Sequence, residues 1–430
     1  MAWSERSTRA VVHLLVALFA SSSWLSVNSV WTQLSLLVPS LPEQWTLPSY
    51  LAAVVQLAIV GPIVCGLLVH RLSHGREDGR RINAAPGILG FISFAILCTG
   101  ALLFFWRWTA PLLGQERSLG LLLCFFGLSL MNSSCDILFL PYMHAFRPEF
   151  LLAFYVGMGL GGFYPGVVAL LQGANKVECV TTTDNATNQS STFPRGVPTR
   201  FGFETFNLLM IGALFASLVA FCLLHWAYFT RSARVSGRRQ AAAGREDAAS
   251  ADKTDEEKEM SHQRYGLLLS VIFVICALMN GVLPSVQSYA SIPYGQQIFQ
   301  YVTILPILAN PLACLVRMVF ALKSMGWILF WAGIGVAVSA YYVLMALMSP
   351  QPLLVGTTIG GVVCVTSATV PIALFAYLRA AMAQQLGSAS GGERRLFWCA
   401  AATQAGSFTG ALLLFPMVNV LGWFQAAPYC

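Results

Sequence analysis

The segment WLSVNSVWTQLSLLVPSLPEQWTLPSY, residues Trp24–Tyr50, indicates how the whole chain is arranged. One apolar stretch, Ala10–Ala20, precedes it, and another, Leu51–Val69, follows it. The segment is therefore expected to end one membrane-spanning helix, turn at the membrane surface and begin the next. This pattern predicts a chain that crosses a membrane repeatedly.

Three residues of this segment would share one face of the first helix, because Trp24, Asn28 and Trp31 are spaced at i, i+4 and i+7. A carboxamide between two indoles is costly in hydrocarbon, so this face is expected to turn toward protein or a water-filled cavity. Such a face suits a flat, uncharged solute that forms hydrogen bonds. Alternatively, the tryptophans mark the membrane interface and Asn28 bonds a neighbouring helix.

The composition excludes an ordinary soluble domain. Of the 430 residues, 57% are hydrophobic and 10% are charged, and the mean hydropathy is +0.67. Charged residues make up about a quarter of a typical soluble domain, so the expected fold class is an all-α polytopic membrane protein. The 11 cysteines lack the spacing of metal ligands, and the chain has no Gly-rich phosphate loop. We therefore expect no metal, no cofactor and no enzymatic activity.

Eleven apolar stretches are long enough to cross a hydrocarbon core of about 30 Å, which takes roughly 20 residues. They lie near residues 10–30, 48–69, 85–106, 118–140, 150–172, 204–229, 265–284, 296–320, 326–348, 353–378 and 396–418. Residues 230–264 have the composition of a disordered cytosolic linker. This linker predicts a six-helix bundle over 1–229 and a five-helix bundle with a short external tail over 265–430, a division expected of carriers whose two halves rock about a central site.

The basic residues predict the orientation in the membrane. With a cytosolic N-terminus and an extracellular C-terminus, 20 of the 25 Lys and Arg residues lie in the cytosol, as the positive-inside rule requires. The net charge of +7 then needs no nucleic-acid partner. The glycosylation acceptors Asn185 and Asn188 fall in a loop that the same rule places outside. Cys179 and Cys430 are also external, so a disulfide between them is predicted, the alternative being two free thiols.

Polar residues inside the spans are candidates for function. Asp136 lies well within a predicted span, which indicates a proton or polar relay; alternatively, it lies near the cytosolic interface and bonds a neighbour. Asn280 and Gln287 share a helix face, and Gly281 and Pro284 between them weaken the helix, as is typical of a cavity wall. Other polar residues are expected mostly to bond backbone carbonyls or neighbouring helices, namely Gln56, Gln300, Thr303, Thr366, Ser367, Thr369, Gln404, Ser407 and Thr409.

A series of motifs runs in order through essentially all the predicted spans. It comprises Asn28 and Trp31, LPEQW (41–45), LPSY (47–50), FLP (139–141), QG (172–173), NGVLPSVQS (280–288), YG (294–295), ANPLA (309–313), MSP (348–350), FP (415–416) and VNVL (418–421). Together these motifs resemble the eukaryotic plasma-membrane riboflavin transporters. The resemblance implies an eleven-span carrier, similar to equilibrative nucleoside transporters and distantly to major-facilitator folds, that takes up riboflavin without sodium.

Some positions depart from the family pattern. The pattern has an acid where this chain has Gln33 and another where it has Met158, and two external cysteines correspond to Ala290 and Gln351. Asp136 has no counterpart in the pattern. The loss of two acids puts proton-coupled uptake in question.

The resemblance and the polar residues together predict the contacts with riboflavin, whose isoalloxazine ring is flat and neutral with a pyrimidine-like edge. The ring is expected to stack on aromatic side chains and its edge to pair with amides. The predicted residues are Trp24, Trp31, Tyr50 and Tyr294 for stacking, and Asn28, Asn280 and Gln287 for pairing. Two alternatives stay open: a carrier of another neutral aromatic solute, such as a nucleoside or another flavin, and a surface receptor that transports nothing. The oligomeric state is left open.

Overall fold

The computed structural model describes residues 5–74, 84–112, 114–143, 146–173, 176–183, 190–197, 199–228, 230, 261–320, 322, 324–387 and 392–426. Within these residues, 11 helical segments are long and apolar enough to cross a membrane. They are Ser7–Ser40, Gln44–Leu68, Ala85–Phe105, Leu119–Phe139, Leu151–Gln172, Phe203–Trp226, His262–Tyr294, Gln296–Arg317, Met325–Leu347, Thr358–Gly387 and Arg394–Asn419. The prediction of an all-α polytopic membrane protein with eleven spans is confirmed.

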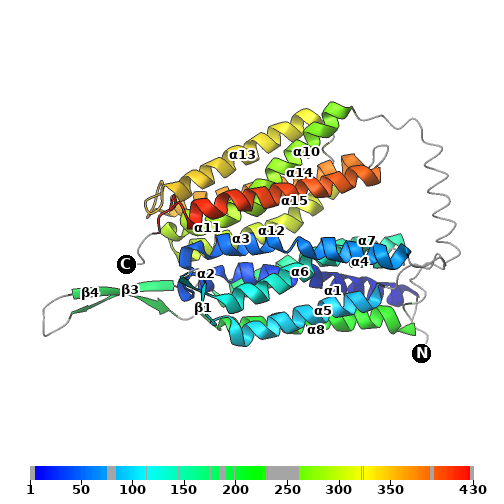
Figure 1. Cartoon of the computed structure of the whole chain (residues 1–430), viewed down its shortest axis with the longest axis horizontal. Coiled ribbons are helices and arrows are strands. Elements are labelled where there is room, and N and C mark those ends of the chain that lie inside the picture. Colours follow the sequence, from blue (N-terminus) through cyan, green and yellow to red (C-terminus); the bar gives the residue numbers. More distant parts are fainter. Residues whose placement is uncertain are drawn as a thin grey trace.

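The helices before the predicted linker pack mainly against one another, and we call them the N-terminal group (Figure 1). Its helices are α1 (Glu5–Thr32), α2 (Leu34–Leu37), η1 (Val38–Ser40), η2 (Gln44–Thr46), α3 (Leu47–Leu57), α4 (Val60–His74), α5 (Ala85–Phe105), α6 (Leu119–Met143), η3 (Pro148–Phe150), α7 (Leu151–Gln172) and α8 (Phe203–Trp226). The helices after the linker form the C-terminal group. They are α10 (His262–Ala277), the π-helix η5 (Leu278–Val282), α11 (Leu283–Ser291), η6 (Ile292–Tyr294), α12 (Gln296–Val319), α13 (Met325–Leu347), α14 (Thr358–Gly387) and α15 (Gly392–Asn419).

Two antiparallel hairpins lie outside the helical layer. Strands β1 (Ala110–Leu112) and β2 (Gln115–Arg117) join α5 to α6, and β3 (Lys176–Thr183) and β4 (Ser190–Val197) join α7 to α8. The longer hairpin pairs Lys176 with Val197 and Thr183 with Ser190. Both hairpins lie at the same end of the molecule, which we call the hairpin end (Figure 1). The opposite end, where α1 begins, is the amino-terminal end, and α15 ends at the hairpin end as an odd number of spans requires.

Glycines permit the closest helix contacts in each group. A Cβ atom built on Gly157 of α7 would lie 2.3 Å from the Ala17 carbonyl oxygen of α1, and one built on Gly410 of α15 would lie 2.2 Å from the Ala277 carbonyl oxygen of α10. Such distances exclude any side chain, so these helix backbones touch directly, as small residues allow in membrane bundles.

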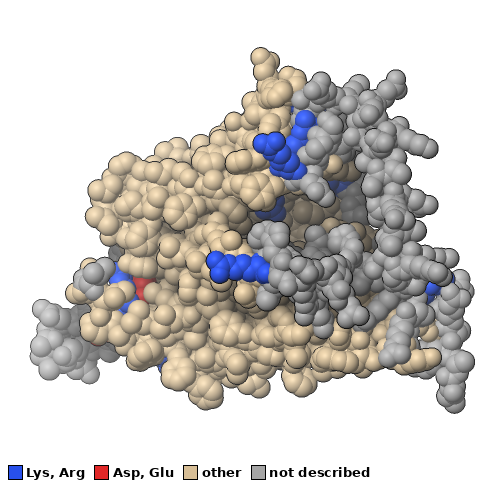
Figure 2. Space-filling view, turned by 45° about the vertical axis from the view of Figure 1, so that its right-hand side comes forward, with Lys and Arg blue, Asp and Glu red and all other residues tan. Residues whose placement is uncertain are grey.

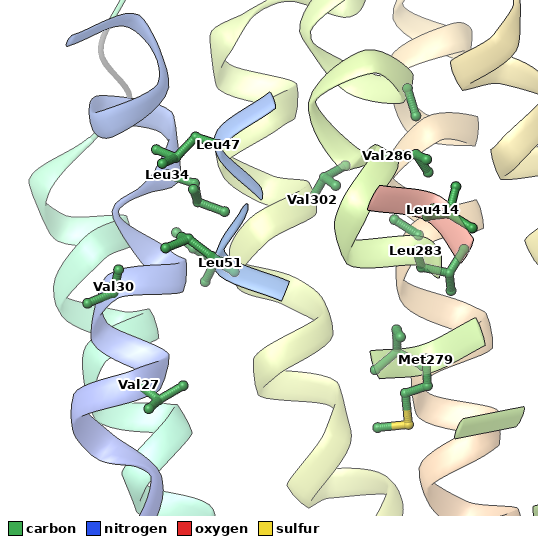
Figure 3. Packing of buried hydrophobic residues seen from close by; sticks show 14 of the residues in the cluster. Val27, Val30, Leu34, Leu47, Leu51, Met279, Leu283, Val286, Val302 and Leu414 are labelled. Atoms are coloured by element: carbon green, nitrogen blue, oxygen red, sulfur yellow. The ribbon is translucent and has the colours of Figure 1, made fainter. Parts of the chain in front are cut away.

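The two groups meet through α2, α3 and α7 on one side and α11, α12 and α15 on the other. Buried apolar residues from both groups form one continuous cluster across this boundary. Figure 3 shows part of it, with Leu34, Leu47 and Leu51 on one side, Leu283 and Val286 on the other and α12 between them. Apolar packing therefore holds the groups together and not only each group by itself.

The opening segment ends one span at Ser40 and begins the next at Gln44, so the predicted turn between two spans is confirmed. The structure adds that protein covers this turn, because Leu41 is only 4% exposed and Trp45 only 2%. Helix α11 packs over it: the Tyr289 ring lies 5.6 Å from the Trp45 ring, and Ser288 Oγ donates a hydrogen bond to the Trp45 carbonyl oxygen.

The boundaries of the predicted linker also differ in the structure. Helix α10 begins at His262, three residues before the predicted start of the span at 265. Thr230, placed in the linker by its composition, is fully buried, and its hydroxyl donates to the Leu224 and Ala227 carbonyl oxygens.

Candidate functional site

Helices α7 and α12 cross near the middle of both helices, and Asn28 lies at this crossing. A Cβ atom built on Gly162 would lie 3.2 Å from Asn28 Nδ2 and 3.0 Å from Ile307 Cγ2. One turn earlier, a Cβ atom on Gly159 would lie 3.0 Å from Pro311 Cβ. The carboxamide predicted from the sequence therefore faces the boundary between the groups, and among the described residues it has no hydrogen-bond partner.

The two predicted tryptophans of α1 have different surroundings. Trp24 is 36% exposed, and its backbone nitrogen lies beside Gly161 of α7, at the level of the crossing. Trp31 packs edge-to-face on Phe125 of α6, with ring centroids 6.3 Å apart. Trp24 thus has a ring surface available for stacking, whereas Trp31 contributes to the packing of the N-terminal group.

Asn280 lies in the π-helical segment η5, where the sequence predicted a weakened helix. Its Nδ2 donates to Ser407 Oγ of α15 at 2.9 Å, and Ser407 Oγ in turn donates to the Thr403 carbonyl oxygen at 2.8 Å. The Asn280 carboxamide oxygen accepts no hydrogen bond from the described residues. π-Helical turns are often found at functional sites, and this one presents a fixed carboxamide with a free acceptor.

Gln287 is 8% exposed, and its Nε2 is buried without a hydrogen-bond partner among the described residues. In Figure 3 Val27 and Met279, the chain neighbours of Asn28 and Asn280, lie at a similar level along the helices, with α12 passing between them. The three predicted amides come from both groups, and each has at least one donor or acceptor atom without a hydrogen-bond partner among the described residues.

The two predicted tyrosines lie nearer the hairpin end and already have partners. The Tyr50 ring packs edge-on against Phe415 of α15 at 5.1 Å, and the Arg117 guanidinium lies 4.8 Å from its centroid. The Tyr294 hydroxyl donates to the Leu353 carbonyl oxygen. No contact between either tyrosine and Trp24 or the predicted amides is found among the described residues, so the structure does not bring all seven predicted residues into one cluster.

Polar contacts join the two groups at the hairpin end. Gln300 Nε2 of α12 donates to the Ala169 carbonyl oxygen of α7 at 2.8 Å, and Asn419 Nδ2 of α15 donates to Ser49 Oγ of α3 at 2.9 Å. With the contacts of Trp45, these bonds form what we call the hairpin-end latch. Gln300 was predicted to bond a backbone carbonyl or neighbouring helix, and this prediction is confirmed.

Toward the amino-terminal end the groups separate. The contacts described between the groups extend from the latch to the Gly159–Pro311 level, and beyond it α12 and α7 expose Leu315 and Tyr155. Figure 1 shows the C-terminal group diverging from the N-terminal group in this direction. In Figure 2, which brings this end forward, the molecule is hollowed between the groups.

Helices α1 and α6 carry buried polar residues that were not found from the sequence. The two helices pack through Trp31 on Phe125 and through Phe19 on Phe139, with ring centroids 6.3 Å and 4.7 Å apart. The side-chain polar atoms of four residues are buried without hydrogen-bond partners among the described residues, namely Ser23, Ser26, Ser129 and Asn132. The sequence did not single them out, because they stand among apolar residues and serine is common in membrane helices.

Gln33, where the family pattern has an acid, also has a polar partner. Its Nε2 donates to Gln172 Oε1 at 2.7 Å, and Gln172 Nε2 donates to the Phe201 carbonyl oxygen at 2.9 Å. The pair links α1 to the end of α7 through neutral groups.

A separate cavity of about 240 Å³ lies at the hairpin end of the N-terminal group. Its walls include Trp106, Arg107 and Glu204, and none of the predicted substrate-binding residues lines it.

Several predictions fall on residues that the structure does not describe. Asn185, Asn188 and Cys430 lie outside the described residues. For Cys179 in β3 and Asp136 in α6 the backbone is placed but the side chain is not described. Within the described residues no group of three or more His, Cys, Asp and Glu residues is suited to hold a metal ion.

The fold is that of a membrane transporter. Solved structures with similar folds include the nucleoside transporter NupG, with a TM-score of 0.54, 11% identity and coverage of 95% of this chain and 92% of that chain. A D-xylose–proton symporter gives a TM-score of 0.55 at 14% identity, covering 97% of this chain and 92% of that chain. The described helices therefore share the overall fold of these two transporters.

The sequence comparisons give the family. Residues 8–426 match the family model described as solute carrier family 52, riboflavin transporter. Riboflavin transporter rft-1 of Caenorhabditis elegans is 34% identical over 432 residues, covering 97% of this chain and 98% of the relative. Solute carrier family 52, riboflavin transporter, member 3 of Homo sapiens is 32% identical over 468 residues, covering 98% of each. The chain belongs to the solute carrier family 52 riboflavin transporters.

Proposed function

We propose that this protein is a plasma-membrane carrier that moves riboflavin by alternating access and without sodium. Units 1–229 and 265–430, joined by the linker 230–264, would move about the α7–α12 crossing, with the N-terminus in the cytosol and the C-terminus outside. The arginines with described side chains support this orientation, because three lie at the hairpin end and eight at the amino-terminal end. The hairpin-end arginines are Arg107, Arg117 and Arg200, and the others are Arg9, Arg71, Arg147, Arg264, Arg317, Arg379, Arg394 and Arg395.

One observation carries the proposal: amides from both groups have hydrogen-bonding atoms without partners among the described residues. Asn28 belongs to the N-terminal group, and the Asn280 oxygen and the Gln287 nitrogen belong to the C-terminal group. A neutral ring with a hydrogen-bonding edge satisfies such groups without the cost of burying a charge. The exposed ring of Trp24 offers a stacking surface beside them.

The latch and the separation at the other end support an alternating mechanism. With the hairpin end outside, the described conformation opens to the cytosol. Substrate would leave there, and the latch would break when the opposite end closes, since a rocking carrier opens one end at a time.

Uptake of radiolabelled riboflavin into cells that express the protein tests the proposal. We expect uptake above that of untransfected cells, unchanged when sodium is replaced by choline. Asn28→Ala and Asn280→Ala should each lower uptake about tenfold, because a lost hydrogen bond to a buried polar edge costs about 1–2 kcal/mol. Wild-type uptake equal to that of untransfected cells would reject the function.

Two further experiments distinguish riboflavin transport from the two alternatives, a carrier of another solute and a receptor. Inhibition by unlabelled nucleosides that exceeds inhibition by unlabelled riboflavin would favour a carrier of another neutral aromatic solute. Thermal stabilisation by riboflavin without any uptake would favour a receptor. Because the family acids are absent at Gln33 and Met158, we expect uptake to change little between pH 6 and pH 8, and a strong pH dependence would point to another group, with Asp136 as the first to substitute.

A further inference from the structure

The charge is unequal at the two ends of the described structure. At the hairpin end the three arginines with described side chains accompany three acids with described side chains, Glu43, Glu116 and Glu204. At the amino-terminal end the acidic residue with a described side chain is Glu149, and it pairs with Arg147 at 3.9 Å. In Figure 2 blue side chains surround the hollow at this end, and the red seen in that view lies on the opposite side.

Arg379 of α14 is half-buried, and its guanidinium lies close enough to the thiols of Cys276 of α10, Cys314 of α12 and Cys399 of α15 to interact with them electrostatically. This guanidinium is therefore near three neighbouring helices, whereas basic residues at helix ends usually extend to lipid headgroups. A charged group inside a membrane bundle is a functional candidate by default.

Two more arginines flank Arg379. Arg317 lies three residues after Cys314 and donates to Gln384 Oε1 of α14. Arg395 lies four residues before Cys399, with its guanidinium 5.6 Å from the centroid of the Tyr265 ring. We call Arg317, Arg379 and Arg395 the arginine mouth, because they lie at the amino-terminal end of the C-terminal group, where the two groups separate.

The arginine mouth has donors without acceptors. Arg317 Nε and Arg395 Nη1 are both buried and have no hydrogen-bond partner among the described residues. None of the three guanidinium groups forms an ion pair with a described carboxylate. Buried polar atoms are nearly always paired in proteins, and cations inside a bundle need an anionic partner. The amide of Gln384 accepts a hydrogen bond from Arg317 but carries no charge to neutralise it.

We propose that the arginine mouth binds the dianionic phosphate group of a phosphate monoester. Guanidinium groups present planar, paired donors that match phosphate oxygens, and several arginines from different helices suit a doubly charged group. Riboflavin itself is neutral and passes this cluster without being held. If the proposed function holds, a flavin phosphorylated on this side becomes a ligand that keeps the amino-terminal end open and slows the return of the carrier.

Thermal unfolding of the purified full-length protein tests the site with three probes: inorganic phosphate, riboflavin 5′-phosphate and riboflavin. We expect both phosphate-bearing probes to stabilise the wild type. Arg379→Gln and Arg317→Gln should raise the concentration needed for half-maximal stabilisation by riboflavin 5′-phosphate about tenfold, because each removes a charge-assisted contact. Arg394→Gln is the matched control, since Arg394 is exposed and adjacent to Arg395, and it should leave this concentration unchanged.

Three results would overturn the proposal: no stabilisation of the wild type by either phosphate-bearing probe, an equal loss in Arg394→Gln, or full retention in both test variants. Protein in nanodiscs containing phosphatidylserine gives a further arm. If that lipid abolishes the thermal stabilisation by the phosphate-bearing probes, the arginine mouth binds a lipid headgroup, and the proposal of a soluble monoester is wrong.

The riboflavin arm keeps the two proposals distinguishable. Stabilisation by riboflavin that persists in Arg379→Gln shows that the variant is folded and that only the phosphate response is lost. A wild type that responds to phosphate but not to riboflavin would count against the proposed substrate and leave the anion site supported. If Arg379→Gln does not fold, Arg379→Lys replaces it, because lysine keeps the charge but loses the paired geometry and should weaken binding of the monoester less than tenfold but measurably.

Discussion

The hairpin end and the amino-terminal end of this molecule use their polar residues in opposite ways. At the hairpin end the amides of Gln300 and Asn419 join the two groups, and acids balance the arginines. At the amino-terminal end the groups part, and arginines inside the C-terminal group have no described acidic partner. The difference teaches that polar contacts join the groups at one end, whereas at the other end polar side chains remain without described partners, as the proposed mechanism requires. Four predictions test or sharpen this comparison.

The largest effect is expected at the latch. Trp45→Ala should destabilise the protein by about 3–5 kcal/mol, because it removes a buried indole packed between the groups. Trp45 is 2% exposed and contacts the Tyr289 ring. Thermal unfolding of purified protein measures the loss. The control is Trp327→Ala, an exposed indole on α13, which should change stability little; an equal effect of the two variants would contradict the latch.

A smaller effect is expected at the start of α6. Both oxygens of Glu43 accept hydrogen bonds from Ser118, one from its backbone N–H and one from its hydroxyl, each at 2.7 Å. Glu43→Ala should cost about 1–3 kcal/mol, because it leaves buried donors unpaired at a helix N-terminus. The exposed Glu116→Ala serves as control in the same unfolding assay, and a Glu43 variant as stable as this control would show that Ser118 finds another acceptor.

The interhelical amides of the latch should influence which end is open. Asn419→Leu or Gln300→Leu removes one hydrogen bond between the groups, a change of about 1 kcal/mol that shifts the two populations about fivefold toward opening at the hairpin end. Labelling of a cysteine introduced at Ala52, a buried position of α3, by a membrane-impermeant thiol reagent added outside would report this shift. Thr366→Val, which affects a bond within α14, should leave labelling unchanged, and lower labelling in the latch variants would count against the idea.

The smallest effect on stability is expected at the α7–α12 crossing. Trp24→Ala should change the free energy of unfolding by no more than about 0.5 kcal/mol, because its side chain is 36% exposed. The same variant should lose most of the stabilisation that riboflavin gives. Trp31→Ala, which removes packing on Phe125, should show the reverse: a larger loss of stability with a smaller change in the response to riboflavin. The opposite order would exchange the roles assigned to the two tryptophans.

Much of this architecture could be predicted from the chain alone. The number of spans follows from the length of the apolar stretches, and the position of Asn28 at a protein boundary follows from helical spacing and the cost of an amide in lipid. The break near Asn280 follows from Gly281 and Pro284. The buried turn at Leu41 and Trp45 did not follow, because a Pro-rich segment looks the same whether water or another helix covers it.

The candidate site could be predicted only in part for a similar reason. Trp31, Tyr50 and Tyr294 are of the residue types that contact flat ligands, yet in the structure their side chains contact Phe125, Phe415 and the Leu353 carbonyl oxygen. Their partners come from helices distant in the sequence, and helical spacing within one span carries no information about those partners. The buried residues Ser23, Ser26, Ser129 and Asn132 were missed because each, taken separately, resembles an ordinary polar residue of a membrane helix.

The sequence by itself determined that this protein spans a membrane eleven times, because the thickness of the hydrocarbon core sets the length of each apolar segment. It also determined the resemblance to the riboflavin carriers, because the motifs and their order can be read directly along the chain. Only the tertiary structure decided, within the part of the chain that it describes, which amides keep unpaired hydrogen-bonding atoms, at which end polar contacts join the groups, and which arginines have no acidic partner there. These properties depend on contacts between helices from distant parts of the chain, and a contact is fixed only when both partners are placed.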